Sequence, residues 1–405
     1  MSLDEAVKTV ANRIRRQEYV EVYAHHDADG IAAGAILCHA MLRADIQFRL
    51  RVCAEVDTAS LNRDSASLLC DIGSGMENLP RETIVVDHHL PRFEGEFHAN
   101  PRLSGIDGDL NLSAAGTAYL VACQMGDNRD LAGLVMPGII GDGQELAGKN
   151  LEIFNEGVGN GIIFPDRGLT LPGKDMPERW LAAIRPYLEG ISGDETVVAA
   201  LAGEAQIGQN MRLDILLTIA MLRAAPHTSA EGLFMLYGDT FRLQREVIED
   251  AHTLAAVIDA CGKSGNGDLG AELCLRSSHA LDRAYGIARQ HRLKVIEAIR
   301  AMQPDTTTPP VCEVHDTSLA RDVADVLVRD RVHAAPVLVY ARSGDTCRIS
   351  ARSPAGTAAD IGPVVRDLAT ACGGNGGGHR RRAGATIPCD RLGTFVQGWK
   401  EAFAA

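Results

Sequence analysis

The stretch that decides the fold reads Glu-Tyr-Val-Glu-Val-Tyr-Ala-His-His-Asp-Ala-Asp-Gly and spans residues 18–30. Its beginning, residues 18–24, is rich in β-branched and aromatic side chains, a composition typical of a strand. The strand runs into His and Asp residues, and the alanine-rich segment that follows to about Arg43 predicts a helix. Strands that alternate with helices indicate a parallel α/β sheet, in which ligands bind beyond the carboxyl ends of the strands. This polar cluster therefore lies where a ligand site is expected.

Three further strands are predicted, at residues 46–52, 67–70 and 83–86. The second of them runs into Asp71-Ile72-Gly73, and the third runs into Asp87-His88-His89. Because the carboxyl ends of parallel strands meet at one edge of a sheet, we expect these side chains to gather beside the His and Asp residues of the first strand.

The rest of the chain is predicted to be helical first and α/β afterwards. Helices are expected at residues 113–125 (with Ser113 as N-cap), 131–140, 180–188, 195–202, 213–223, 241–260 and 279–302, with an irregular connection at 157–177. Beyond a proline-rich linker at 303–310 we expect strands near 311–314, 336–340, 347–351 and 385–387, a helix at 360–371, a glycine-rich loop at 373–379 and a terminal helix. The predicted fold is α/β, with an N-terminal parallel-sheet domain at 1–192, a helical insertion at 193–305 and a smaller C-terminal α/β domain at 306–405.

Composition excludes several classes of protein. The 405 residues carry a formal net charge of −13 and only 4% aromatic side chains, which argues against a protein that neutralises many duplex phosphates or stacks bases along an extended platform. The ten cysteines form no Cys-x-x-Cys pair, which argues against a zinc knuckle or an iron–sulfur cluster. No apolar run approaches the roughly 18 residues of a membrane span. We expect a cytoplasmic protein without a secretory signal and without a membrane partner.

The acidic residues and histidines at the predicted strand ends have the chemistry of a metal site. Each of them alone is an ordinary turn residue, but so many like charges at one edge of a sheet are costly unless a cation neutralises them. Carboxylate and imidazole ligands without a thiolate suit Mn²⁺, with Mg²⁺ or Zn²⁺ less favoured. Two ions about 3.5–4 Å apart can share a bridging hydroxide and stabilise the charge that develops on a phosphoryl group.

These motifs resemble those of the DHH phosphoesterase superfamily, which is named after the triplet that stands here as Asp87-His88-His89. Its other motifs correspond to His25-x-Asp27-x-Asp29-Gly30, Asp71-Ile72-Gly73 and Gly138-Ile139-Ile140-Gly141-Asp142, and its C-terminal DHH-associated domain to Ser350-Ala351-Arg352-Ser353 and Gly376-Gly377-Gly378-His379. Within the superfamily, the stretches that are similar to archaeal RecJ-like exonucleases are Asn100-Pro101 with Gly105–Gly108, Gly190–Gly193, and Cys261-Gly262 ahead of Leu273–Leu275.

The resemblance implies a two-metal site with Mn²⁺ as the ion and Mg²⁺ as a substitute. One ion would be bound by His25, Asp27 and Asp71, and the other by Asp29, Asp71, His88 and Asp142. Asp71 would bridge the two ions and so take part in catalysis.

The remaining motif residues would act beside the metals. By the same resemblance, His89 would contact the scissile phosphate and Asp87 would orient the histidines. His26 is extra to the motif and could replace His25 as the ligand, so this assignment stays open. Asn100 and Ser113 are further candidates for the site.

The C-terminal candidates suit phosphate binding. A glycine-rich dinucleotide loop follows a strand and opens a helix, whereas residues 373–378 follow a predicted helix and precede a strand, so a dinucleotide site is not expected. We instead expect a backbone nest that accepts an anion, to which His379 and Arg352 add charge. The resemblance implies that Ser350, Arg352, Gly376, Gly377, Gly378 and His379 bind substrate. Arg348 and Arg380 are further candidates, although a run of arginines such as 380–382 is more often a solvated face.

The predicted function is that of a RecJ-like exonuclease, which hydrolyses single-stranded DNA or RNA from an end through a metal-bridged hydroxide. One alternative is a small-substrate phosphoesterase acting on oligoribonucleotides, cyclic dinucleotides or pyrophosphate. The other is a replisome scaffold that retains the fold. The resemblance also implies association with the GINS complex or with a repair helicase, in DNA replication or repair in an archaeal cell.

Overall fold

The computed structural model describes residues 2–62, 65–207, 210–302, 309–330, 335–354, 356–357, 360–378 and 380–403. The chain divides into two compact units, of which the first comprises Met1–Pro172 with Asp239–Ala288 and the second comprises Gly173–Gly238 with Arg289–Ala405. The boundaries expected at residues 192 and 305 stay predictions, and residue 305 lies outside the described residues.

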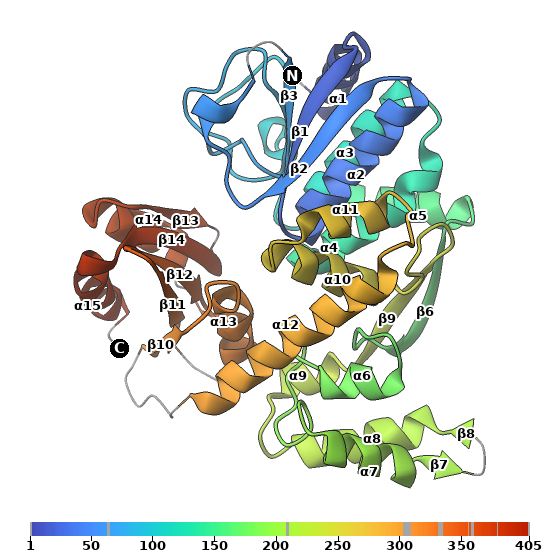
Figure 1. Cartoon of the computed structure of the whole chain (residues 1–405), viewed down its shortest axis with the longest axis vertical. Coiled ribbons are helices and arrows are strands. Elements are labelled where there is room, and N and C mark those ends of the chain that lie inside the picture. Colours follow the sequence, from blue (N-terminus) through green and yellow to red (C-terminus); the bar gives the residue numbers. More distant parts are fainter. Residues whose placement is uncertain are drawn as a thin grey trace. The chain divides into compact units, whose positions relative to one another are not determined.

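The first unit contains a five-stranded sheet in the order β2-β1-β3-β4-β5, in which all strands are parallel (Figure 1). Its strands are β1 (Tyr19–His25), β2 (Gln47–Cys53), β3 (Ala66–Cys70), β4 (Ile84–Val86) and β5 (His98–Ala99). Ala24 of β1 pairs with Cys70 of β3, and Cys70 pairs with Val86 of β4. The residues that follow these three strands therefore begin at the same edge, which confirms the prediction of a parallel sheet with convergent strand ends.

The two faces of this sheet are covered differently. Strand residues of even number, such as Val22 and Leu68, pack into the main core with the helices. Residues of odd number, such as Tyr23, Leu69 and Val85, pack into a smaller core whose other members come from the segment 53–93. This alternation follows from the twofold repeat of side chains along a strand. Helices cover one face and irregular chain covers the other.

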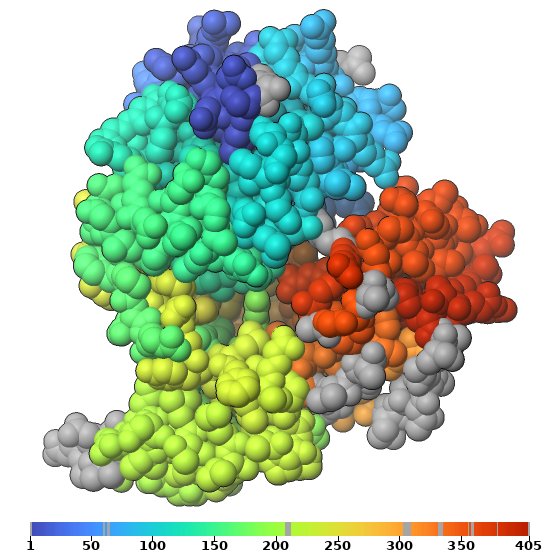
Figure 2. Space-filling view, turned by 180° about the vertical axis from the view of Figure 1, so that it is seen from behind, coloured from blue at the N-terminus to red at the C-terminus, as the bar shows by residue number. Residues whose placement is uncertain are grey.

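The helices on the main core are rich in small residues, which let them approach the sheet closely. α2 (Ala28–Arg43) contains five alanines and two glycines and is buried over most of its length. It packs against α3 (Ala114–Met125) and α4 (Val135–Asp142). α1 (Leu3–Arg15) packs against α3 and β5 and lies at the surface in the view of Figure 2, in dark blue. Its Ser2 and Glu5 form a capping box.

Two predictions for the rest of this unit are wrong. Residues 157–177 contain the end of α5 (Gly148–Gly159) and the strand β6 (Ile163–Leu169), and residues 241–260 begin in the strand β9 (Tyr237–Leu243) before α10 (Ala251–Lys263). β6 and β9 form a two-stranded sheet. Pro165 and Gly168 weaken the local strand signal, and the pairing joins segments that are far apart in the sequence. α11 (Gly267–Cys274) and α12 (Leu281–Ala301), in which the boundary between the units falls, follow.

In the second unit, the segment 173–238 is helical. It contains α6 (Met176–Leu181), α7 (Glu195–Glu204), α8 (Leu213–Ala224), α9 (Ala230–Phe234) and the short strands β7 (Gln206–Ile207) and β8 (Asn210–Met211). The helix predicted at 180–188 is wrong in its extent, because α6 ends at Leu181 and Pro186 lies within the predicted range.

The C-terminal part of this unit is a second five-stranded sheet in the order β10-β11-β12-β14-β13, with only β10 and β11 parallel. Its strands are β10 (Val311–Val314), β11 (Val337–Ser343), β12 (Thr346–Arg352), β13 (Asn375–Gly378) and β14 (Arg382–Pro388), with helices α13 (Ala320–Arg329), α14 (Ile361–Ala371) and α15 (Leu392–Ala402). The prediction of a glycine-rich loop is wrong for residues 375–378, because these residues form β13. Glycine has a low strand propensity, so pairing with β14 decides this structure.

None of the helices in the described part of the chain combines the length and the hydropathy that a membrane span requires.

Candidate metal centre

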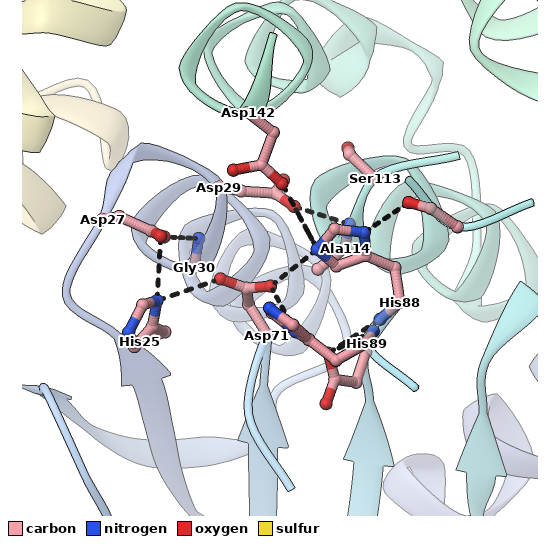
Figure 3. A network of polar contacts seen from close by, with 12 residues as sticks. His25, Asp27, Asp29, Gly30, Asp71, His88, His89, Ser113, Ala114 and Asp142 are labelled. Atoms are coloured by element: carbon pink, nitrogen blue, oxygen red, sulfur yellow. Dashed lines mark hydrogen bonds and ion pairs between the residues drawn. The ribbon is translucent and has the colours of Figure 1, made fainter. Parts of the chain in front are cut away.

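The carboxyl edge of the first sheet gathers the acidic residues and histidines that the sequence singled out (Figure 3). His25 is the last residue of β1, and Asp71 follows β3 directly. Asp27 is the N-cap of α2, where its Oδ1 accepts a hydrogen bond of 3.2 Å from the backbone N–H of Gly30. Side chains of this cluster form three groups that could hold a metal ion, namely His25 with Asp27 and Asp71, Asp29 with His88 and Asp142, and Asp71 with His88 and His89.

Asp71 lies between the first two groups. Its Oδ2 is 3.2 Å from Nδ1 of His25, and its Oδ1 is 3.3 Å from Nε2 of His88. Asp71 also adopts a left-handed backbone conformation with φ of 59°, which is uncommon for a residue other than glycine and is typical of functional sites. The position and the two-sided carboxylate match the bridging role that the resemblance implies.

The second group is formed by side chains from three different elements. Nε2 of His88, beyond β4, is 3.3 Å from Oδ2 of Asp142 at the end of α4 and 3.8 Å from Oδ2 of Asp29 in the first turn of α2. Asp29 is completely buried, whereas the side chain of Asp142 is 21% exposed. One side of this group is therefore open to solvent.

The N-terminus of α3 holds Asp29 in place. The backbone N–H groups of Ala114 and Ala115 donate hydrogen bonds of 2.7 and 2.8 Å to the two carboxylate oxygens, at the positive end of the helix dipole. Gly138 of α4 leaves the room for this carboxylate, because a Cβ atom at position 138 would lie 2.1 Å from Oδ1 of Asp29. Ser113 caps α3, as predicted, and thereby orders the N–H groups that Asp29 uses.

A chain of hydrogen bonds orients His88. Its Nδ1 lies 2.5 Å from the carbonyl oxygen of Gly108, so Nδ1 carries the proton and Nε2 presents a lone pair to the cluster when the ring is neutral. The side-chain amide of Gln144 donates to the same carbonyl at 2.9 Å, and Asn150 donates to the Gln144 side chain at 2.8 Å. Gln144 and Asn150 therefore hold the acceptor that fixes this imidazole.

Asp87 organises the turn of the triplet. Its Oδ1 accepts hydrogen bonds from the backbone N–H groups of His88 and His89 and from Nδ1 of His89, the last at 2.8 Å. Its Oδ2 accepts from the backbone N–H of Ser74. The Ser74 hydroxyl accepts from Nδ2 of Asn100, which also donates to the carbonyl of His89 at 2.9 Å. Asp87 and Asn100 thus tie both histidines to the sheet.

The charges of the cluster perturb its pKa values strongly. Burial, joined by the carboxylates of Asp71 and Asp142, raises the pKa of Asp29 well above its usual value. Burial would lower the pKa of His25, but Asp27 and Asp71 outweigh it and raise that pKa well above its usual value. Burial alone would likewise lower the pKa of His88, but Asp71 and Asp142 raise it. Asp29, His25 and His88 thus bind protons more tightly than isolated side chains of the same type.

The donor set fits divalent cations. Oδ1 of Asp71 and Nε2 of His88 are buried and make no hydrogen bond within the described residues, so each has a lone pair available for another ligand. A carboxylate-rich set with imidazole and no cysteine among the three groups suits hard or borderline ions. A cation would also offset the charges of Asp71 and Asp142, which together with burial raise the pKa of Asp29.

The sequence left open whether His25 or His26 is a ligand. His26 belongs to none of the three groups, and its ring meets that of His25 edge to face, with the ring centroids 4.5 Å apart. Its carbonyl oxygen is covered by Gly262 of α10, where a Cβ atom would lie 1.6 Å away. The geometry therefore favours His25 as the ligand, and Gly262 is required for the close approach of α10 to this loop.

The C-terminal candidates lie side by side on the second sheet. Gly384 of β14 pairs with Ser350 of β12 on one side and with Gly377 of β13 on the other, so that the two predicted motifs share one row across the sheet. Gly376 and Gly378 flank this row, and a Cβ atom at Gly378 would lie 2.3 Å from the carbonyl oxygen of Arg382.

The arginines of this sheet differ in their surroundings. Arg348 and Arg380 are exposed, whereas Arg352 is buried and forms an ion pair with Asp325 of α13. His379 lies outside the described residues, so the structure does not place it.

Several residues of the site have no signal of their own in the sequence. Ser74, Gln144 and Asn150 act through backbone groups or through other side chains, and their partners lie up to 37 residues away along the chain. His98 is buried, and its Nε2 lies 2.8 Å from the Ser74 hydroxyl. Gly108 and Gly138, in contrast, stand within stretches that the sequence analysis named.

Comparisons with known proteins agree with this architecture. The DHHA1 domain family matches residues 313–405. MJ0831, an uncharacterized protein of Methanocaldococcus jannaschii, is 24% identical over 428 residues, which cover 98% of this chain and 96% of that protein.

Two solved structures share the fold. RecJ of Thermus thermophilus, in complex with Mn²⁺, matches with a TM-score of 0.63 and 18% identity over 98% of this chain and 53% of that one. CDC45 of Entamoeba histolytica matches with a TM-score of 0.61 and 12% identity over 100% of this chain and 99% of that one. This chain therefore spans about half the length of the Thermus RecJ chain.

Proposed function

We propose that this chain, which has the RecJ-like fold of the DHH phosphoesterases and ends in a DHHA1 domain, is a metal-dependent exonuclease that hydrolyses single-stranded nucleic acid from an end. The observation that carries the proposal is the position of Asp71 between the group of His25 and Asp27 and the group of Asp29, His88 and Asp142. Such a set of ligands holds two cations that share one carboxylate, and two-metal sites of this kind catalyse displacement at phosphorus.

His25, Asp27, Asp29, Asp71, His88 and Asp142 are the proposed ligands. Two bound cations, Mn²⁺ or Mg²⁺, would supply activation of the attacking water and neutralisation of charge on the phosphoryl oxygens. His89 is half-exposed beside this set, and burial, which would lower its pKa, is outweighed by Asp87, so its pKa is raised. In its protonated form His89 would donate a hydrogen bond from Nε2 to a phosphate oxygen, while Asp87 keeps the ring in place through Nδ1.

Ser350, Arg352 and the glycines 376–378 are the proposed substrate contacts in the second unit. Backbone N–H groups of the glycines, together with a guanidinium, suit the phosphates of a nucleic acid strand. The net charge of −13 supports a single strand held at local positive sites rather than a duplex held by a basic surface. A cytoplasmic location and association with GINS or a repair helicase stay predictions.

The experiment compares substrates under one condition. End-labelled single strands of DNA and of RNA, a dinucleotide and pyrophosphate are each incubated with the protein and Mn²⁺, Mg²⁺ or EDTA, and the products are resolved by length. The proposal expects stepwise shortening of the long strands with either metal and none with EDTA. Hydrolysis of only the dinucleotide or pyrophosphate would instead support a small-substrate phosphoesterase. No hydrolysis of any substrate would contradict catalysis and leave a scaffold role, for which the likeness to the CDC45 fold is the supporting observation.

A further inference from the structure

Arg352 is held on one side only. Its Nε donates to Oδ1 of Asp325 at 2.5 Å, and its Nη1 donates to the Ser350 hydroxyl at 3.1 Å and to the carbonyl of Ala351 at 2.9 Å. A guanidinium has five N–H donors, so these contacts use three of them. Among the described residues, Nη2 donates no hydrogen bond, and its two N–H groups are left for a ligand.

The fixed side of this guanidinium depends on a residue of another element. Arg352 is at the end of β12, whereas Asp325 projects from α13, which packs against β11 and β12. The side chain of Arg352 is 6% exposed and that of Asp325 is 29% exposed. Burial would raise the pKa of Asp325, but Arg352 and then Arg382 outweigh it and keep that pKa far below its usual value. The carboxylate is thus a permanent acceptor for Nε.

Asp325 lies beside the basic side chains of Arg352 and Arg382, with Asp322 as a further carboxylate nearby. Arg382 pairs with Arg352 in the register of β12 and β14, and both contribute to the low pKa of Asp325. A carboxylate here weakens the local positive potential, which is unfavourable for a site that binds a polyanion. This unfavourable effect of Asp325 on anion binding is offset if its carboxylate fixes the orientation of the Arg352 guanidinium.

We infer that Asp325 is a positioning residue, which together with Ser350 aims the free Nη2 edge of Arg352 at a phosphate of the bound strand. This inference rests on the proposed function and adds to it a residue outside every motif that the sequence showed. An arginine held at Nε and Nη1 loses less rotamer entropy when a phosphate arrives, so the pair binds more tightly than a free arginine would.

Charge and geometry give opposite expectations, which makes the inference testable. If Asp325 acts only through its charge, then both Asp325→Ala and Asp325→Asn remove a negative charge and strengthen binding of a single strand. If Asp325 positions Arg352, then Asp325→Ala weakens binding, while Asp325→Asn retains an oxygen that accepts from Nε and largely preserves it.

The measurement is fluorescence anisotropy of a labelled single-stranded DNA of about 12 nucleotides. EDTA prevents hydrolysis, and salt at about 0.3 M shortens the Debye length to roughly 5–6 Å and suppresses long-range charge effects. We expect Asp325→Ala, Arg352→Ala and Arg352→Lys each to weaken binding by about 10- to 100-fold. Asp325→Asn should stay within about threefold, since a neutral acceptor keeps roughly half the strength of a charged one.

A double variant separates positioning from independent contributions. Asp325→Ala combined with Arg352→Ala should bind no more weakly than Arg352→Ala alone, because Asp325 acts only through that guanidinium. Asp367→Asn is the matched control, since Asp367 of α14 also accepts from an arginine Nε, at 3.2 Å, but on an exposed surface. It should bind like the wild type, and melting temperatures are measured for every variant.

Four results would overturn the inference: a wild-type protein that does not bind the strand, binding by Asp325→Ala that equals or exceeds the wild type, losses that multiply in the double variant, or Arg352→Lys that binds normally. The last of these does not depend on whether Asp325→Ala folds. Failure of the proposed function has a different signature, namely wild-type protein that binds the strand but does not shorten it when Mn²⁺ is added.

Discussion

Oδ1 of Asp71 lies 3.3 Å from Nε2 of His88, and neither buried atom makes a hydrogen bond within the described part of the chain. A buried polar atom without a hydrogen bond is costly, and native structures rarely keep two of them face to face unless another ligand satisfies both. The pair therefore marks the centre of the proposed metal site.

Replacement of Asp71 by Asn should remove the shared ligand. The change keeps the size of the side chain but removes the negative charge, so we expect hydrolysis of single strands in Mn²⁺ to fall by about 10²- to 10³-fold or more. Calorimetric titration with Mn²⁺ should show weaker binding or fewer ions per chain. Wild-type rates in this variant would rule out the bridging role.

Gln144→Ala should loosen His88 without removing a ligand. The carbonyl of Gly108 loses one of its donors, so the imidazole is held less firmly and the affinity for Mn²⁺ should fall by about 10- to 100-fold. Gln397→Ala is the control, because Gln397 makes an exposed hydrogen bond on α15. If both variants bind Mn²⁺ like the wild type, the amide of Gln144 has no part in positioning His88.

Gly138→Ala should displace Asp29. The new methyl group would lie 2.1 Å from Oδ1 of Asp29 and 2.9 Å from Cβ of Ala115, so we expect a loss of about 1–3 kcal/mol in unfolding free energy together with a loss of activity.

Gly286→Ala in α12 is the matched control for this substitution. A Cβ atom at position 286 meets nothing within 4 Å, and alanine should stabilise the helix by about 0.4–1 kcal/mol. Denaturant unfolding and strand hydrolysis measured on both variants check the pair, and an active, stable Gly138→Ala protein would contradict the packing argument.

Asp130 should make stability depend on pH at acid values. Hydrogen bonds from Arg43, joined by those from Arg276, keep the pKa of Asp130 well below its usual value of 3.8. As the pH falls, Asp130 is therefore protonated in the unfolded chain before it is protonated in the folded one. Its contribution to the free energy of unfolding is complete above about pH 5 and is lost as the pH falls toward the pKa of the folded state.

The corresponding variant is Asp130→Asn. We expect it to lose about 1–3 kcal/mol near neutral pH and progressively less as the pH falls below about 4. Urea unfolding at several pH values measures this difference, and a difference that stays constant down to the lowest pH would show that the carboxylate is not responsible.

Most of the first sheet and of the metal cluster could be predicted from local sequence. β1 ends in His25, β3 and β4 are short runs that Asp71 and Asp87 follow directly, and Ser113 is an N-cap by residue type alone. β13 could not be predicted in this way, because four residues that include three glycines have no strand preference until β14 pairs with them. β6 and β9 were missed for the same reason.

The amino-acid sequence alone singled out the proposed ligands, because most of them stand next to strand ends and the parallel arrangement brings such ends to one edge. Only the tertiary structure decided how each proposed site residue is held. The N–H groups at the start of α3 hold Asp29, and the carbonyl of Gly108 holds His88. Asp325 of α13 holds Arg352. These partners are far apart along the chain, and hydrogen bonds to backbone groups are possible for any residue type. These contacts therefore cannot be predicted from the residue types, and only the packing of the folded chain brings the partners together.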